Sequence, residues 1–167
     1  IFTAYLLNIF FLVNAQQPAP GKPFIAIDHV PIVVKNLDSI KQILSTDFHF
    51  KIKEGREHEG IKNCFLKFPD GTYLELISPV DSLETTGKYY TQFLKRRQGG
   101  TSLAVSVTNT KVISAKLQGA SFPFEVDSNA IWKTVSPTGV DLFFIEYANR
   151  AWKDSKINTT HPNQSLQ

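Results

Sequence analysis

A histidine and two glutamates stand at matched places in a pattern that occurs twice in this chain. His29 lies in an apolar segment that runs into a polar turn, and Ser102 lies at the same place in a similar segment. Each segment is followed by an apolar strand with one carboxylate: Glu75, 46 residues after His29, and Glu146, 44 residues after Ser102. A repeat of about 72 residues indicates two similar modules. We therefore expect one imidazole and two carboxylates in equivalent positions.

Both glutamates are expected on apolar strand faces. Because side chains alternate along a strand, Glu75 shares a face with Tyr73 and Ile77, and Glu146 shares a face with Phe144. A carboxylate buried there is costly unless it is paired, protonated or bound to a metal. For a single buried glutamate, a nearby Lys, Arg or tyrosine hydroxyl would be a sufficient partner. Two buried glutamates at matched positions of a repeat instead favour one ligand that both of them bind.

Together, His29, Glu75 and Glu146 form a set with one nitrogen ligand and two carboxylates. Such a set suits a divalent ion such as Zn, Mn, Fe or Ni and leaves open positions for water or substrate. The alternative for His29 alone is a structural histidine at a strand end. We expect all three side chains to point into one cavity if the set binds a metal.

The elements that would position these residues follow the order β-α-β-β-β twice. In the first module we expect strands at about 25–35, 48–53 and 62–68, a helix at 37–46, a turn at 69–71 and then the strand that carries Glu75. In the second we expect strands at 101–107, 121–126, 131–135 and 140–147, with a helix at 110–118. The modules span 25–78 and 101–148, joined by a connector at 79–100.

The ends of the chain differ from this domain. Residues 1–15 are uncharged and mostly apolar and end in a small-residue cleavage pattern at Ala15, which is typical of a truncated signal peptide. A flexible lead-in at 16–24 follows, and a polar tail occupies 149–167. We therefore expect a secreted or periplasmic protein, with an N-terminal membrane anchor as the alternative.

Composition narrows the classes of function. The net charge is +3, from 18 basic and 15 acidic residues, which is too small an excess to favour nucleic-acid binding. Cys64 is the single cysteine, so no internal disulfide can form. Its strand pattern predicts a buried, unreactive thiol rather than a nucleophile.

Two consecutive stretches resemble a known superfamily. Residues 58–63 (HEGIKN) and 65–77 (FLKFPDGTYLELI) are similar to the signature of the glyoxalase-like branch of the vicinal-oxygen-chelate superfamily, which also contains bleomycin-resistance proteins and dioxygenases. The resemblance covers about residues 25–148. It implies an α+β fold in which two βαβββ modules pair into an incomplete barrel. The superfamily hosts lyases, isomerases, oxygenases and inert binders, so the fold alone does not set the activity.

The resemblance implies a metal-dependent lyase or isomerase that forms an enolate on a small oxygen-chelating substrate. Glu75, Glu146 or His58 would move the proton, and Asn63 and Ser102 would contact the substrate. Ser102 stands where metal-binding relatives often have a second histidine, which lowers the expected metal affinity and argues against the two-histidine iron site of extradiol oxygenases. His58 could instead be a solvated loop residue.

The alternative is a binding module without chemistry, in which an aromatic-lined cleft sequesters a small molecule. Thirteen phenylalanines in the chain suit either hypothesis. Members of the superfamily often dimerise, so a homodimer is an open alternative to a monomer.

Overall fold

The computed structural model describes residues 25–126, 132–134 and 141–147. The predicted signal peptide, the lead-in, the turn at 137–139 and the polar tail lie outside these residues. No helix in the described part of the chain is long and apolar enough to cross a membrane.

Two copies of the order βαβββ make up the described domain. The first contains β1 (Ile25–Val33), α1 (Leu37–Thr46), β2 (Lys53–His58), β3 (Ile61–Lys67) and β4 (Tyr73–Pro79). The second contains β6 (Ser102–Val107), α3 (Thr110–Gly119), β7 (Phe124–Val126), β8 (Trp132–Thr134) and β9 (Asp141–Glu146). Between them lie α2 (Thr85–Leu94) and the short β5 (Gly99–Gly100). The predicted α+β fold of two paired modules is confirmed.

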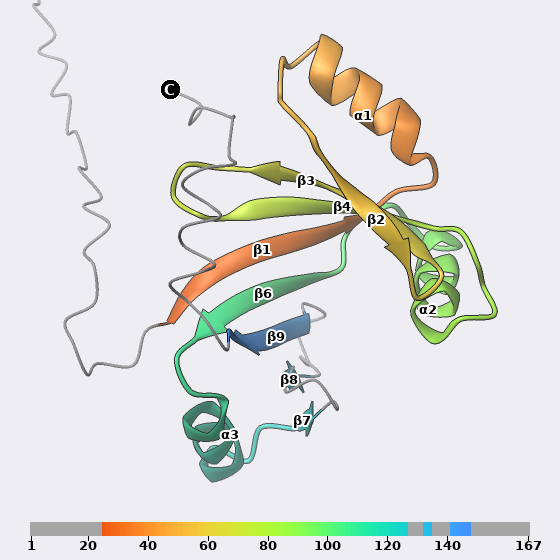
Figure 1. Cartoon of the computed structure of the whole chain (residues 1–167). Coiled ribbons are helices and arrows are strands. Elements are labelled where there is room, and N and C mark those ends of the chain that lie inside the picture. The colour runs from red at the N-terminus through yellow and green to blue at the C-terminus, as the bar shows by residue number, and fades with distance from the viewer. Residues whose placement is uncertain (1–24, 127–131, 135–140, 148–167) are drawn as a thin grey trace, which may run out of the picture.

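The strands form one open sheet in the order β2-β3-β4-β1-β6-β9-β8-β7, with β5 paired to β1. The modules meet where β1 and β6 pair in antiparallel fashion at the centre of the sheet (Figure 1). Within each module the first and last strands are parallel, β1 with β4 and β6 with β9. One row across the four central strands consists of Tyr73, His29, Ala104 and Phe143.

Two asparagines mark equivalent helix starts in the modules. The Asn36 side chain accepts a hydrogen bond from the backbone N–H of Ser39 at the start of α1, at 2.9 Å. Asn109 does the same for Val112 at the start of α3, at 3.2 Å. Such N-caps satisfy backbone donors that a helix leaves unpaired. Because Asn109 follows Asn36 by the same number of residues as Ser102 follows His29, the equivalence of His29 and Ser102 holds in the structure.

The core divides between the two faces of the sheet. Leu66, Leu76 and Cys64 pack with α1 on one face, and Val105, Val107 and Phe144 pack with Ile113 of α3 in the second module. On the other face, Val33, Ile61 and Ile77 pack against Tyr90, Phe93 and Leu94 of α2. The predicted burial of Cys64 is confirmed, and burial raises the pKa of its thiol to about 11.

The predicted position of the second strand was wrong. The alternating residues 48–53 predicted a strand there, but β2 begins at Lys53 and ends at His58. Glu59 and Gly60, with φ angles of 51° and 74°, form the two-residue turn that joins β2 to β3. Phe50 belongs to no strand and instead packs its ring edge-on against Phe68.

Candidate functional site

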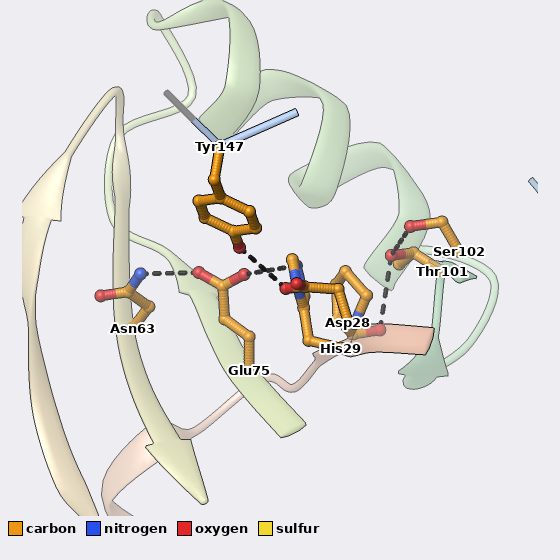
Figure 2. Close-up of polar contacts among 8 residues, drawn as sticks. Asp28, His29, Asn63, Glu75, Thr101, Ser102 and Tyr147 are labelled. Atoms are coloured by element: carbon orange, nitrogen blue, oxygen red, sulfur yellow. Dashed lines mark hydrogen bonds and ion pairs between the residues drawn. The ribbon is translucent and has the colours of Figure 1, made fainter. Parts of the chain in front are cut away.

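His29 and Glu75 face each other from neighbouring parallel strands. His29 pairs with Tyr73 in the β1–β4 register, so Glu75 lies two residues further along the same face. The His29 Nε2 atom lies 3.5 Å from Glu75 Oε2, as Figure 2 shows. The imidazole is almost fully buried, whereas the Glu75 side chain keeps 17% of its surface exposed. The pair is therefore reachable from solvent through Glu75.

The other ring nitrogen of His29 contacts a carboxylate that the sequence analysis did not select. His29 Nδ1 lies 2.9 Å from Asp28 Oδ1, and the Tyr147 hydroxyl donates to the same oxygen at 2.9 Å. A register shift between Ile27 and His29 interrupts the pairing of β1 with β6. Because such a bulge breaks the alternation of side chains, two consecutive residues can interact on one side of the strand. The adjacency of Asp28 and His29 was the available signal in the sequence.

Aromatic rings enclose the imidazole. The Tyr73 ring stacks on His29 at 4.5 Å between centroids, and Phe143 contacts it edge-on at 5.5 Å. Burial raises the pKa of Tyr73 far above its usual range, and the nearby Tyr147, Asp28 and Glu75 raise it further. Tyr73 therefore keeps its phenolic proton and remains a neutral hydrogen-bonding group beside the pair.

Asn63 holds the second oxygen of Glu75. Its Nδ2 donates to Glu75 Oε1 at 2.7 Å, and its Oδ1 accepts from the backbone N–H of Arg56 at 2.9 Å. The strand beside it bulges, and a side chain on Gly55 would clash with the Asn63 amide and carbonyl oxygens. Asn63 was predicted to contact substrate, but its buried amide is engaged on both sides and positions Glu75.

Glu146 does not join the pair, and the expectation that it would is wrong. Its Oε2 accepts from the Thr110 backbone N–H at 2.9 Å and from the Thr110 hydroxyl at 2.7 Å. The backbone hydrogen bond, followed by that of the hydroxyl, holds the pKa of Glu146 below its ordinary value. The residue is exposed and satisfies the first turn of α3, on the face of β9 that carries Phe144.

The strand register explains this error. In the first module Glu75 lies two residues after Tyr73, the partner of His29. In the second module Ser102 pairs with Asp141, so the residue two further along is Phe143. Phe143 is thus the equivalent of Glu75, and Glu146 lies three residues later. An odd offset along a strand places a side chain on the opposite face.

The donor set therefore does not fit the predicted metal site. His29 Nε2 and Glu75 supply two ligand groups, and the equivalent positions of the second module hold Ser102 and Phe143. Across the described ranges, no group of three or more His, Cys, Asp and Glu side chains is arranged to hold a metal ion. Protein sites for Zn and similar ions use at least three such ligands.

Within the described residues, Ser102 forms no hydrogen bond with His29 or Glu75. Figure 2 shows Ser102 on the far side of His29 from Glu75, with its hydroxyl 3.5 Å from that of Thr101. Thr101 is buried, and its backbone N–H donates to the Pro31 carbonyl at 3.0 Å. The contacts of these two hydroxyls are thus with each other and with β1.

His58 is remote from the pair. It ends β2 and pairs with Ile61, which in turn pairs with Pro79 of β4. Glu75 lies four residues before Pro79 and two strands away from His58, so the separation along the strand direction alone is about 13 Å. The predicted role of His58 as a proton carrier for Glu75 finds no support in this arrangement.

The family model of the glyoxalase-like domain matches residues 27–167, which is most of the chain. This chain belongs to the glyoxalase-like family. Its superfamily is the vicinal-oxygen-chelate superfamily, as the motif at 58–77 predicted. A comparison of this glyoxalase-like chain with curated proteins found no match.

Several solved structures share the fold of this glyoxalase-like chain. A hypothetical protein from Bacillus halodurans C-125 is 16% identical, with a TM-score of 0.61 over 75% of this chain and 96% of that one. Methylmalonyl-CoA epimerase from Mycobacterium tuberculosis is 20% identical, with a TM-score of 0.56 over 75% and 90%. The Streptomyces coelicolor epimerase in complex with 2-nitronate-propionyl-CoA is 20% identical, with a TM-score of 0.54 over 74% and 97%. At these identities the likeness shows the fold.

Proposed function

We propose that this protein is an isomerase or lyase that removes a proton from a carbon next to a carbonyl group of a small molecule. The observation that carries the proposal is the His29–Glu75 pair, in which an imidazole nitrogen faces a partly exposed carboxylate oxygen at 3.5 Å. Two titratable groups in hydrogen-bond reach of one reacting centre are the usual requirement for general acid–base catalysis.

Glu75 is the base in this proposal. Its Oε1 is fixed by Asn63, which leaves Oε2 to take the proton, and the electron pair of the broken C–H bond moves into the adjacent carbonyl to give an enolate. Glu75 then carries the proton as a carboxylic acid. His29 Nε2 can exchange a proton with it across the short gap.

The fate of the enolate decides the reaction class. Return of a proton to the opposite side of the carbon gives an isomerase, and expulsion of a leaving group from the next atom gives a lyase. The neutral hydroxyl of Tyr73, which stacks on His29, is a suitable donor to the enolate oxygen. The similarity in fold to methylmalonyl-CoA epimerases supports the isomerase branch, since epimerisation inverts a carbon centre.

The proposal does not need a divalent metal. A metal at the site would acidify the proton through the carbonyl oxygen. With two ligand groups, however, His29 and Glu75 form an incomplete set for such an ion. We therefore expect the reaction to persist in the presence of a chelator such as EDTA.

Hydrogen exchange at carbon tests the proposal directly. The protein is incubated in deuterium oxide with methylmalonyl-CoA, hydroxyacetone or dihydroxyacetone, and loss of the carbon-bound proton is followed by NMR. Glu75→Gln should lower the rate of exchange by about 10²–10⁴-fold, the usual contribution of a general base. Glu57→Gln, on the exposed strand β2, is the matched control and should keep the wild-type rate.

A non-catalytic binder is the second candidate, and one observation favours it. Phe143 occupies the place in the second module where the first has Glu75, and together with Tyr73 it surrounds the imidazole with aromatic surface. Such a site would hold a small ligand without moving a proton. Saturable binding of one of these probes by wild type, with no exchange and no loss of affinity in Glu75→Gln, would support the binder and reject the enzyme.

A further inference from the structure

A continuous chain of polar contacts links the two modules at the site. It starts at Tyr147, the residue after β9, and passes through Asp28 and His29 of β1 to Glu75 of β4. The two hydrogen-bond distances are 2.9 Å each, and His29 Nε2 lies 3.5 Å from Glu75 Oε2. Figure 2 shows the Tyr147 hydroxyl directed toward the Asp28 carboxylate beside the His29 ring.

Asp28 is the one Asp or Glu that is fully buried in the part of the chain that the structure describes. Removing a carboxylate from water is costly unless hydrogen bonds replace those that it loses. The hydroxyl of Tyr147 and the ring of His29 both supply such bonds to Oδ1. Because burial of the Asp28 carboxylate lowers stability, its presence points to a role in orienting Tyr147 and His29.

The contact with Asp28 favours a proton on one particular nitrogen of His29. When Asp28 is ionised its carboxylate can only accept, and the Nδ1 atom at 2.9 Å is then the donor. The other nitrogen, Nε2, then faces Glu75 and is the one that can gain or lose a proton. Stacking on Tyr73 restricts rotation of the ring out of this position.

We propose that Asp28 and Tyr147 are positioning residues that hold His29 as the Nδ1–H tautomer and aim its Nε2 at Glu75. The catalytic part of this inference rests on the proposed function, whereas the tautomer itself does not. Asp28 acts through His29, and Tyr147 acts through Asp28 and also contacts Tyr73. The second module, which has Ser102 and Phe143 at the equivalent ligand positions, thus contributes by orienting the acid–base pair of the first.

Nitrogen-15 NMR of the histidine side chains, combined with the exchange assay, tests the inference. In wild type we expect the Nδ1 of His29 to show a directly bonded proton between pH 6 and 8 in the absence of substrate. Asp28→Asn can present its amide N–H to the ring, so it should lose the fixed Nδ1–H form and slow exchange by about 100-fold. Tyr147→Phe should keep the tautomer, slow exchange by about 10-fold and shift the pH profile of the rate.

Asp141→Asn is the matched control, because Asp141 lies on β9 beside Ser102 and, within the described structure, forms no hydrogen bond or ion pair with the four residues from Tyr147 to Glu75. It should keep the wild-type spectrum and exchange rate. Tyr147→Phe removes a single oxygen atom, so it provides a second test if Asp28→Asn does not fold. Amide spectra report whether each variant keeps the wild-type fold.

The outcomes separate the two proposals. A wild-type His29 protonated on Nε2 alone would overturn the positioning inference, as would an Asp28→Asn variant with unchanged ring signals and rate. Unchanged rate and pH profile in Tyr147→Phe would remove Tyr147 from the proposal. If wild type shows the Nδ1–H tautomer but exchanges none of the probes, the proposed reaction fails for those substrates while the orientation of the ring by Asp28 stands.

Discussion

Glu75 and His29 meet because their strands, β4 and β1, are parallel neighbours in the sheet. The imidazole nitrogen Nε2 lies 3.5 Å from the carboxylate oxygen Oε2. A buried polar residue contacts each partner: Asn63 donates a hydrogen bond to the Glu75 carboxylate, and Asp28 contacts Nδ1 of the His29 ring. These two contacts therefore preorient the pair. Preorientation of this kind reduces the reorganisation that a proton transfer requires.

Replacing Asn63 should weaken both the fold and the site. Asn63→Leu leaves the Arg56 N–H and Glu75 Oε1 without their partner, so we expect the free energy of unfolding to fall by about 1–3 kcal/mol. Urea unfolding measures this loss, and the exchange rate should fall in the same variant. In a Glu75→Gln background the second substitution should affect exchange far less, and equal effects in both backgrounds would contradict a role through Glu75.

Adding the two missing ligand groups to the second module should create a site that binds a divalent metal. Ser102→His combined with Phe143→Glu supplies an imidazole and a carboxylate at positions equivalent to His29 and Glu75. Since four ligand groups would then face one site, we expect affinity for Zn or Ni to rise by at least about 100-fold over wild type in titration calorimetry. Tight binding by wild type would show instead that two donors suffice or that residues outside the described ranges contribute. Ser102→His with Glu146→Ala should bind no more weakly than Ser102→His alone.

Glu146 should contribute to stability in a pH-dependent way and not to catalysis. Its hydrogen bonds with Thr110 hold its pKa below the ordinary value, so the stabilisation is present above the pKa of the unfolded state, about 4.3, and is lost as the pH falls through the lower folded pKa. Glu146→Gln should lower the free energy of unfolding by about 0.5–1 kcal/mol at pH 7, a typical capping contribution. The difference from wild type should vanish in acid, and the exchange rate should not change.

Secretion of the protein stays a proposal, since residues 1–15 lie outside the described structure. The apolar run and the small-residue pattern at Ala15 lead us to expect cleavage after that residue. Mass spectrometry of the protein from the native envelope or medium should find a mature N-terminus at Gln16. Recovery of the uncleaved segment in a membrane fraction would favour an N-terminal anchor.

The sequence by itself predicted much of the first module correctly. The alternation of the strand fixes the face of Glu75, which it shares with Tyr73 and Ile77, and that face is the one that meets His29. The observed helix caps at Asn36 and Asn109 likewise depend on local chemistry, because a short amide side chain satisfies the free N–H groups of the next turn. These features depend on neighbours close in the chain.

Only the tertiary structure decided which residues share the site. His29 pairs with a residue 44 positions later, whereas Ser102 pairs with one 39 positions later, so connections of different length separate the paired strands. Counting along the chain therefore matched Glu75 to Glu146 instead of Phe143. Register is set by hydrogen bonding between strands and by burial of one face, and an offset of three residues moves a side chain from one face of the sheet to the other. The same long-range pairing, with its bulge in β1, brings Tyr147 to Asp28 across 119 residues of chain.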